Sequence, residues 1–576
     1  MFKRAGSSLA PHLRKLHSQA SSSASGVRTG LRAHPGALVS SGAVAAYILW
    51  YTNTRTVHND SASPITLQKI TQTAPGLIAG GDASDSEDLR TVAHFSRVFV
   101  MRSNTLTPED ADVIRTPSIA QWLDGVALRD LVLHRDHAAC VDALGDVYQW
   151  GSGYAGHDLS KSQKPTLTLR EKNITQLKLT EGRLYALSAS GKVYAISTEA
   201  AKQELRPGSP TPSSDSWWGT GWLFVSIEAG NDHVLALTSK GRAFAHPVNK
   251  NANAYGQLGF RKFQIPDPTV HHRSPVNGHL DVELIPKSIA DPYARSNRAS
   301  RPGPAPMMSE NLEGIDDSSI RFCTHLFEIP ILKDIPIEQV AAGGRTSFAR
   351  TTTGRVLGWG ANEYGQIGLG SNVALDTITV PTEVVLWNST SNRGNTKCVD
   401  IAAGGDLTAF TVERIDSSAR STIDLLMCGN GQWGGLGSNI YSSAQGSPLR
   451  AKNVSGLVEY SDVTQSLQPI GPHAVTVSPT GHVLLTLNTA STVDVGGRDL
   501  IVWGKNYESE LGNGKKASVP VPTTLETPEG GRFMLRRRKA KEVKDLHGKV
   551  WKRGVKVEQC AIVGFGNSAV YWRISA

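Results

Sequence analysis

Short apolar segments separated by turn residues recur along residues 96–576. The clearest unit is Ile337–Gly370, which reads IEQVAAGGRTSFARTTTGRVLGWGANEYGQIGLG. In this unit an apolar segment leads into a Gly-Gly pair, a second covers Ser347–Thr351, and a third ends in Trp359-Gly360. Short runs rich in β-branched and aromatic residues and bounded by turn residues predict β-strands.

The same order of segments is repeated, complete or shortened, elsewhere in the chain. The further copies are Leu131–Gly156, Leu177–Ile196, Phe224–Gly259, Val399–Gly437 and Val463–Gly512. Each copy predicts a small antiparallel sheet that cannot bury both faces alone, whereas sheets stacked around an axis bury each other's faces. We therefore expect an all-β fold, a β-propeller over residues 96–576 with seven blades. The count is six if the weak copy Leu177–Ile196 is not a blade.

The two ends of this region predict how the ring closes. Val557–Ser575 is the first half of a unit without a second half, and Arg97–Asn104 resembles a separate second half. An N-terminal strand that completes the C-terminal blade hides two exposed strand edges. We expect Arg97–Asn104 to take this place.

The repeat is similar to that of a known family. G-G-x-H-S, G-x-V-x-x-W-G and Y-G-Q-L-G are the motifs of the regulator of chromosome condensation repeat, and Gly343–Gly370 follows them most fully. The histidine typical of the family is identified at His137, His233 and His473. The resemblance covers about residues 97–576 and implies a β-propeller fold.

Charge is concentrated at two places in the chain. There are 60 Lys and Arg against 51 Asp and Glu, a net charge of +9. Residues 1–59 hold seven basic and no acidic residues, and residues 532–556 hold eleven basic and two acidic residues. The remainder is mildly acidic, which argues against a protein that binds nucleic acid over its whole surface.

The N-terminal region predicts an import signal and a membrane anchor. Residues 1–34 are rich in Arg and Ser and lack acidic residues, which is typical of a mitochondrial presequence. Residues 36–52 form an uncharged, apolar stretch at the short end of what crosses a bilayer as a helix, and residues 53–95 read as a polar linker. We expect one inner-membrane span; the alternative is a longer presequence that is removed together with this stretch. The flanking basic residues favour a matrix-side N-terminus only weakly, so the side of the propeller stays open.

Two long inserts interrupt the repeats, at residues 260–336 and 515–556. The first is polar and Pro-rich, which is typical of a partly disordered loop. The second contains RRRKAKEVKDLHGKVWKR, which fits a solvated charged loop or helix, or a patch for RNA phosphates or anionic lipid headgroups. The candidate partner-binding residues of this insert are Arg536, Arg537, Arg538, Lys539, Lys541, Trp551, Lys552 and Arg553. Trp551 fits a stacked base, a lipid interface or a docking contact on the propeller.

Motifs of catalysis and of cofactor binding do not support an enzyme. Gly151–Gly156 and Gly429–Gly434 fit G-x-G-x-x-G, but both fall inside repeats and neither opens a helix of a βαβ unit. The sequence has no P-loop, zinc-protease or serine-hydrolase motif. The five cysteines are scattered without a C-x-x-C pair, so we expect free thiols. We expect no enzymatic activity, no cofactor and no metal site, because the pair His271-His272 is isolated from other ligands.

The repeats and the N-terminal region together indicate a function. The chain resembles in particular a fungal mitochondrial member of the family, which implies an inner-membrane protein tied to respiratory-chain assembly, above all complex III. We therefore expect a tethered, non-catalytic scaffold whose partners are respiratory-complex subunits or assembly factors. Two alternatives stay open. One is guanine-nucleotide exchange on a mitochondrial small GTPase, an activity of the family's founding members, and the other is binding of the mitochondrial ribosome or RNA through the basic insert.

Overall fold

Antiparallel β-strands make up nearly all regular structure in the computed structural model of the chain. The structure describes residues 93–94, 115–119, 123, 125–156, 165–203, 215–217, 222–266, 279–290, 325–386, 395–416, 420–489, 497–527 and 530–575. All of them belong to one compact unit, Ser84–Ala576. The expected presequence at 1–34 and apolar span at 36–52 lie outside the described residues. Within the described residues, no helix has the length and apolarity needed to cross a membrane.

Seven sheets of four or five strands carry the repeats. Sheet one contains β3 (Asp130–Leu133), β4 (Ala138–Val141), β5 (Val147–Trp150) and β6 (Thr166–Leu169), and sheet two contains β7 (Ile174–Leu179), β8 (Arg183–Ser188), β9 (Val193–Ser197) and β10 (Asp215–Trp217). Sheet three contains β11 (Phe224–Ala229), β12 (His233–Thr238), β13 (Ala243–Pro247) and β16 (Phe327–Glu328), and sheet four contains β17 (Ile337–Ala342), β18 (Thr346–Thr351), β19 (Val356–Ala361) and β20 (Thr377–Val384).

The remaining sheets continue this order along the chain. Sheet five contains β21 (Asn395–Gly404), β22 (Leu407–Ile415), β23 (Ser421–Gly429) and β24 (Gln445–Arg450), and sheet six contains β27 (Pro472–Val477), β28 (His482–Leu487), β29 (Arg498–Gly504) and β30 (Val519–Thr524), with β31 (Met534–Leu535) paired to β29. Sheet seven contains β32 (Arg537–Lys544), β33 (Val550–Val563), β34 (Ser568–Ile574), β1 (Ala93–His94) and β2 (Ser118–Ile119). Two separate hairpins are β14 (Lys262–Pro266) with β15 (His279–Glu283), and β25 (Val458–Ser461) with β26 (Ser466–Pro469). The short helices are α2 (Ser152–Ala155), α4 (Lys287–Ala290), η2 (Ala200–Lys202), η3 (Lys250–Asn253) and η5 (Pro330–Leu332).

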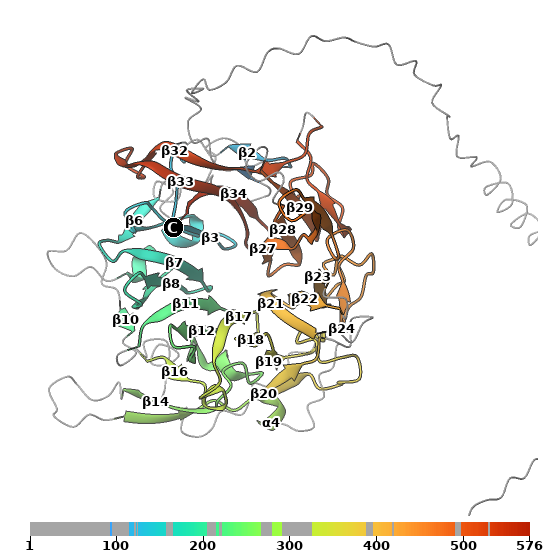
Figure 1. Ribbon diagram of the computed structural model, residues 1–576. Helices are drawn as coiled ribbons and strands as arrows, with labels where there is room; N and C mark the ends of the chain where they lie inside the picture. The colour runs from blue at the N-terminus through green and yellow to red at the C-terminus, as the bar shows by residue number, and fades with distance from the viewer. Residues whose placement is uncertain are drawn as a thin grey trace, which may run out of the picture. The chain divides into compact units, whose positions relative to one another are not determined.

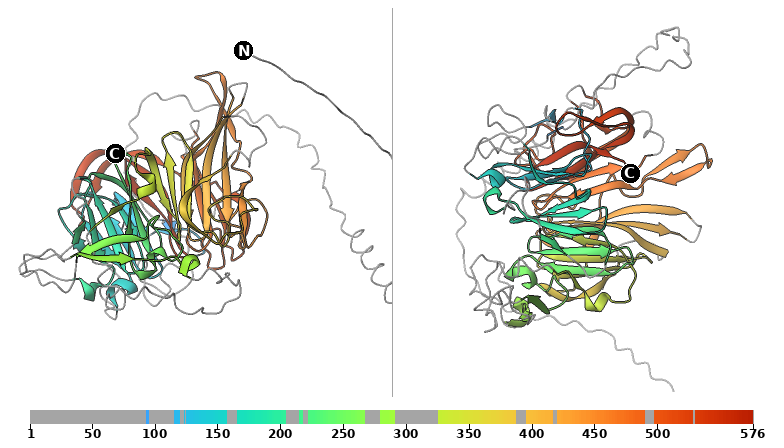
Figure 2. Two further views of the ribbon diagram at one scale, coloured as in Figure 1. Left: turned by 90° about the horizontal axis from the view of Figure 1, so that it is seen from below. Right: turned by 90° about the vertical axis from the view of Figure 1, so that its left-hand side faces the viewer.

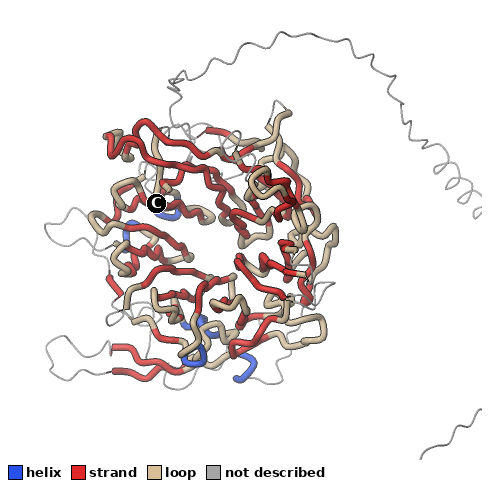
Figure 3. The backbone as a smooth tube through the Cα atoms, viewed as in Figure 1, coloured by secondary structure: helices blue, strands red, loops and turns tan. Residues whose placement is uncertain are grey.

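The first strand of each repeat, which is β33 in sheet seven, lies beside a common axis (Figure 1). Each contacts the first strand of the next sheet, from β3 through β7, β11, β17, β21 and β27 to β33, and β33 contacts β3 again. The sheets therefore form a closed ring, in which strands predominate around the whole circumference (Figure 3). The predicted all-β propeller is confirmed.

The two ends of the compact unit meet in sheet seven. β1 pairs with β34, with His94 opposite Ala569, and β2 pairs with β1. The residues expected for this role, Arg97–Asn104, lie outside the described residues. The backbone N–H of Leu128 donates to the carbonyl of Trp572 at 2.9 Å, and the Leu128 carbonyl accepts from Ile574 at 2.8 Å. An N-terminal strand thus completes the C-terminal sheet, and backbone hydrogen bonds close the ring.

The tryptophan of the W-G motif joins neighbouring sheets. Trp359 is fully buried, and its indole N–H donates to the carbonyl of Gln257, which belongs to the Y-G-Q-L-G motif of sheet three, at 2.9 Å. The indole of Trp503 donates in the same way to the carbonyl of Gly435 in the W-G-G-L-G segment of sheet five, at 2.9 Å. The two halves of the repeat motif therefore meet across each of these interfaces, which explains why they recur together.

Both inserts contain more regular structure than we expected from the sequence. Within residues 260–336, β14 pairs with β15, and β16 is the outer strand of sheet three. Within residues 515–556, β30, β31, β32 and the first part of β33 are strands, so the expected loop or helix is wrong for the described part of this insert. Ala540 and Val543 of β32 are buried, and this inward face was hidden in the sequence by the basic residues around it.

The repeat histidine of sheet six is His482, and the sequence-based assignment to His473 is wrong. His473 lies in the first strand of its sheet, whereas His233 and His482 each begin a second strand. His482 Nε2 lies 3.0 Å from Ser568 Oγ, as His233 Nε2 lies 2.8 Å from Ser347 Oγ, and in both cases the serine belongs to the next sheet. Sheet six accordingly starts at β27, because the separate hairpin β25–β26 occupies the residues after 457.

Trp359→Ala tests the interface between sheets three and four. Removing a fully buried indole and leaving a cavity costs about 3–5 kcal/mol of the free energy of unfolding. Trp359→Phe keeps most of the ring and loses the hydrogen bond, so it costs about 0.5–1.5 kcal/mol for that bond besides a smaller packing loss. Urea unfolding followed by circular dichroism measures both variants.

The control for this experiment is Leu375→Ala, because the Leu375 side chain is 63% exposed. We expect its free energy of unfolding within about 0.5 kcal/mol of the wild-type value. Equal stability of Trp359→Ala and Leu375→Ala would contradict a joining role of the tryptophan.

Candidate functional site

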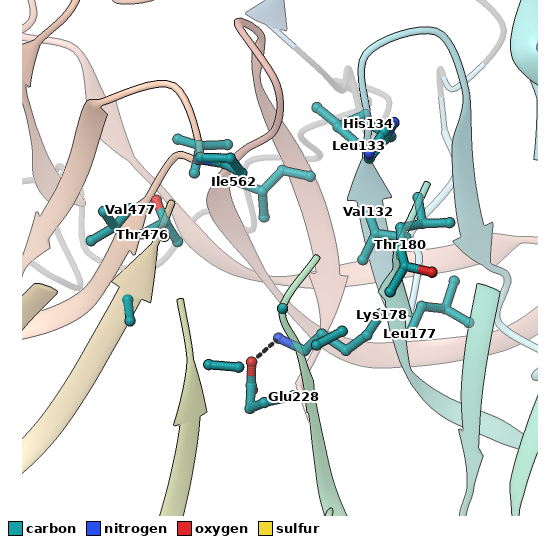
Figure 4. Close-up of a pocket in the computed structure, with 18 of the residues that line it drawn as sticks. Val132, Leu133, His134, Leu177, Lys178, Thr180, Glu228, Thr476, Val477 and Ile562 are labelled. Atoms are coloured by element: carbon teal, nitrogen blue, oxygen red, sulfur yellow. Dashed lines mark ion pairs between the residues drawn. The ribbon is translucent and has the colours of Figure 1, made fainter. Parts of the chain in front are cut away.

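The first strands enclose an axial cavity of about 1210 Å³, to which all seven sheets contribute. Lys178 of β7 and Glu228 of β11 meet in this cavity as an ion pair at 2.8 Å (Figure 4). Desolvation raises the pKa of Asp130 on β3 to about 6, although the N–H of Leu177 donates to its carboxylate at 2.7 Å. Lys178 also lies near enough to favour the charged form of Asp130. These charges connect the first strands of sheets one to three.

A second cavity, of about 660 Å³, lies between sheets six and seven. Its lining residues are His473 and Arg498 of sheet six, with Arg537, Arg538, Lys539, Lys556, Glu558, Arg573, Ile574 and Ser575 of sheet seven and its end. Six of them are Arg or Lys and a single one is a carboxylate. Such an excess of cations in a cavity creates a positive potential that attracts anions. We call this cavity the basic pocket.

The pairing of β32 with β33 builds one wall of the basic pocket. In this antiparallel pair Lys539 lies opposite Lys556, and Arg537 lies opposite Glu558. Like charges directly opposite each other destabilise a sheet. An anion bound between Lys539 and Lys556 relieves this repulsion, so the register of the hairpin favours an anionic ligand.

Glu558 is the carboxylate of the basic pocket and is surrounded by cations. Arg573 Nη2 lies 2.5 Å from its Oε1, and His473 Nε2 and Arg498 Nη1 each lie 3.8 Å from its Oε2. The contact with His473, followed by that with Arg573, lowers the pKa of Glu558 to about 2. Its negative charge is therefore present at any physiological pH and offsets only part of the positive charge around it.

The candidate residues of the basic insert separate into two groups in the structure. Arg537, Arg538 and Lys539 line the basic pocket. Exposed positions outside this lining are held by Arg536, Lys541, Lys552 and Arg553. The second group lies on or beside the β32–β33 hairpin, so it extends the positive surface around the pocket without forming its wall.

Trp551 anchors the β32–β33 hairpin on the propeller. Its half-buried side chain packs against the cluster that includes Ala540, Val543 and Trp572. The Arg538 guanidinium lies 4.6 Å from the ring centre of Trp572, which orients this arginine toward the same cluster. These contacts agree with the third interpretation of Trp551, a docking contact on the propeller.

Seven pocket residues were missed in the sequence: His473, Arg498, Lys556, Glu558, Arg573, Ile574 and Ser575. His473 and Arg498 lie in repeats far from the basic insert, and only the packing of sheet six against sheet seven brings them to it. Lys556 ends the basic run. Its place opposite Lys539 indicates that it belongs to the pocket, but this can be read from the sequence only once the β32–β33 hairpin is recognised.

Four of the five cysteines lie within the described residues. Cys140, Cys398 and Cys428 are buried free thiols and Cys560 is a half-buried one, so the expectation of free thiols is confirmed for these four. Burial raises the pKa of Cys398 to about 12, which makes its thiol unreactive at neutral pH. Cys323 and the pair His271-His272 lie outside the described residues.

Known protein families and relatives match the repeat region. Two family models, both described as the regulator of chromosome condensation repeat, match residues 353–411 and 337–366. The Saccharomyces cerevisiae protein named "Protein FMP25, mitochondrial" is 22% identical over 487 residues, which covers 80% of this chain and 70% of that protein. The Xenopus laevis regulator of chromosome condensation is 24% identical, with 66% of this chain and 82% of that protein covered.

A solved structure shares the fold. The crystal structure of Prp20p from Saccharomyces cerevisiae, described with its binding properties to Gsp1p and histones, has a TM-score of 0.50 at 15% identity. The similarity covers 85% of this chain and 93% of that chain, and at this identity it concerns the fold alone. The chain therefore carries repeats of the regulator of chromosome condensation family, and their sheets form a β-propeller.

Proposed function

We propose that this chain is a mitochondrial, non-catalytic scaffold whose seven sheets are the seven blades of a propeller. It assists the assembly of inner-membrane respiratory complexes, complex III in particular. The similarity to a mitochondrial relative along 80% of the chain carries this proposal. The acid-free, Arg-rich residues 1–34 and the apolar stretch 36–52 support import and tethering to the inner membrane.

An exposed apolar hairpin supports a role in binding proteins. In β25–β26, Tyr460 lies directly opposite Leu467, and their side chains are 53% and 66% exposed. Val458 on the same strand as Tyr460 is 49% exposed, and Val463 at the hairpin end is 94% exposed. Contiguous exposed apolar side chains mark interaction sites. Strands in this part of the chain, drawn in orange, project on one side of the ring (Figure 2), where a partner reaches them freely.

Deletion of the gene should lower the amount of assembled complex III, measured on native gels of mitochondrial membranes. Expression of the wild-type chain should restore it. A chain with Tyr460→Ser and Leu467→Ser should restore it poorly, because the hairpin loses its apolar contact while the sheets that pack the core are unchanged.

The matched control carries Leu375→Ser and Tyr441→Ser, which also replace exposed apolar side chains, 63% and 57% exposed, at other places. We expect this control to restore complex III as the wild type does. Normal complex III in the deletion strain would reject the assembly role, and full rescue by the hairpin variant would reject the hairpin as the docking site.

The basic pocket supports a second candidate function, the binding of mitochondrial RNA or the mitochondrial ribosome. Replacing Arg536, Arg537, Arg538 and Lys539 by Glu should abolish RNA retention, because phosphate contacts dominate such binding. Each lost contact with a single strand lowers the slope of log affinity against log salt by about 0.7. Filter binding of RNA over a salt series measures both quantities.

The control for RNA binding replaces Lys240, Lys333, Lys397 and Lys452 by Glu, which changes the net charge equally at exposed positions outside the basic insert. Retention that falls equally in both variants would show a nonspecific charge effect. Protease treatment of mitoplasts adds a decisive comparison, since RNA binding needs a propeller on the matrix side, where added protease does not reach it.

A third candidate, guanine-nucleotide exchange on a mitochondrial small GTPase, rests on the fold alone. Prp20p is described as binding Gsp1p. Release of a fluorescent guanine nucleotide from mitochondrial GTPases should accelerate when the chain is added, and an unchanged release rate rejects this candidate.

A further inference from the structure

The turn between β3 and β4 begins with a histidine. In this turn and in the equivalent turns of sheets two, three, four and seven, the N–H of the first residue donates to the carbonyl of the fourth. The pairs are His134 with His137, Thr180 with Arg183, Gly230 with His233, Gly343 with Thr346, and Gly564 with Asn567, at 2.9, 2.9, 2.9, 3.0 and 2.9 Å. A histidine therefore stands where three equivalent turns have glycine and one has threonine.

The geometry of this turn brings three metal-ligating side chains together. His134 and His137 are opposite each other across the turn, so their side chains lie on the same face, and their ring centres are 4.7 Å apart. Asp136 Oδ1 lies 3.2 Å from His137 Nδ1. One ligand atom from each of the three residues lies within 4.8 Å of the others. Bonds of about 2.0–2.2 Å to one ion need only small side-chain rotations from this arrangement.

His137 also lacks the partner that the equivalent histidines have. His233 and His482 each contact a serine of the next sheet through Nε2, at 2.8 and 3.0 Å. The equivalent residue for His137 is Leu184, the second residue of β8 as Ser347 is the second residue of β18. Among the described residues, His137 Nε2 is buried without a hydrogen-bond partner.

The second histidine of the turn has an unpaired nitrogen too. His134 Nδ1 is buried and has no hydrogen-bond partner in the described part of the chain. Buried polar atoms are nearly always paired, so two such nitrogens in one turn require an explanation. A bound ion supplies one for His134 Nδ1 directly, because a metal accepts the lone pair that no donor reaches. His137 Nε2 reaches the same ion as Asp136 once its ring is turned over, since Asp136 faces the other ring nitrogen.

The donor set of the turn suits a metal ion. Two imidazoles and one carboxylate are the ligand set of many zinc sites, in which a fourth position stays open for water or a further ligand.

The turn lies at the mouth of the axial cavity. His134, Asp136 and His137 all belong to the lining of that cavity, and Figure 4 shows His134 beside Leu133 at its edge. The Phe565 ring, from the corresponding turn of sheet seven, lies 4.7 Å from the His134 ring and shields one side. The open ligand position therefore faces a cavity rather than the apolar core.

We propose that His134, Asp136 and His137 bind a divalent transition-metal ion of the zinc type at the mouth of the axial cavity. This proposal is independent of the assembly function and departs from the expectation, drawn from the sequence, that the chain has no metal site. The metal fixes the turn of sheet one against sheet seven, the two sheets at which the ring closes, through Phe565.

The test uses the full chain without a polyhistidine tag, freed of metals by a chelator. Co²⁺ is the probe, because four-coordinate Co²⁺ with imidazole ligands absorbs visible light. We expect the visible band to saturate at one equivalent of Co²⁺, Zn²⁺ to abolish it, and Zn²⁺ to raise the melting temperature. A wild-type chain without a visible band and without a Zn²⁺-dependent shift in melting temperature overturns the proposal.

Variants locate the ion. His134→Gly with His137→Thr installs the residues found at Gly343 and Thr346, so the turn remains one that this fold accepts. We expect this variant to lose the band and to bind Zn²⁺ at least about tenfold more weakly. Asp136→Asn, at a partly exposed position, is the second variant in case the first one folds poorly, and we expect a weakened site there too. Unchanged Zn²⁺ affinity in folded variants places the ion elsewhere and overturns the proposal.

Asp232→Asn is the matched control for these variants. Asp232 precedes His233 in the turn of sheet three as Asp136 precedes His137, but that turn begins with Gly230 and offers one histidine. We expect Asp232→Asn to keep the visible band and the Zn²⁺ affinity of the wild type. An equal loss in this control would show a general effect of removing a carboxylate and would overturn the assignment to the turn of sheet one.

Discussion

The structure depends on one constraint, that each sheet has two apolar faces and no layer of helices to cover them. The middle strands β8, β12, β18 and β28 are buried at every position, which requires a neighbouring sheet on both sides. A linear stack leaves its two end faces exposed, whereas a ring covers all of them. The contact of β33 with β3 and the pairing of β1 with β34 complete this ring.

Closing the ring makes the inner turns a crowded place. An added Cβ at Gly343 would lie 2.3 Å from Thr346 Oγ1, and at Gly564 it would lie 2.2 Å from Asn567 Oδ1, so these turns accept only glycine without rearrangement. His134 of sheet one and Thr180 of sheet two stand where these turns have glycine, and both line the axial cavity. Of the two, His134 brings a metal-ligating side chain to the cavity.

Sheet seven carries the second departure from the repeat. β33 is long enough to pair with β32 over its first part and with β34 over its second, and the two pairings overlap at Val557 and Glu558. This extension moves the basic insert onto the body of the propeller, where Trp551 packs into the core and the arginines and lysines meet cations of sheet six. The charged surface is thus held by strands, whose register fixes which side chains lie opposite each other.

The sequence by itself determined the repeating strands, the all-β propeller and the family, because strand period and turn residues are local properties of the chain. It also located the basic insert, but not its strands, since basic residues masked the inward-facing Ala540 and Val543. The histidine of sheet six was misplaced at His473. The two apolar segments of this repeat, β27 and β28, are similar in sequence and are distinguished only by their pairing. The basic pocket was decided by tertiary structure, because its side chains are brought together by strand register and by the packing of sheet six on sheet seven. His134, Asp136 and His137 are neighbours in the sequence, and tertiary structure decided the burial of their nitrogens and the cavity that they line, because both depend on the surrounding sheets.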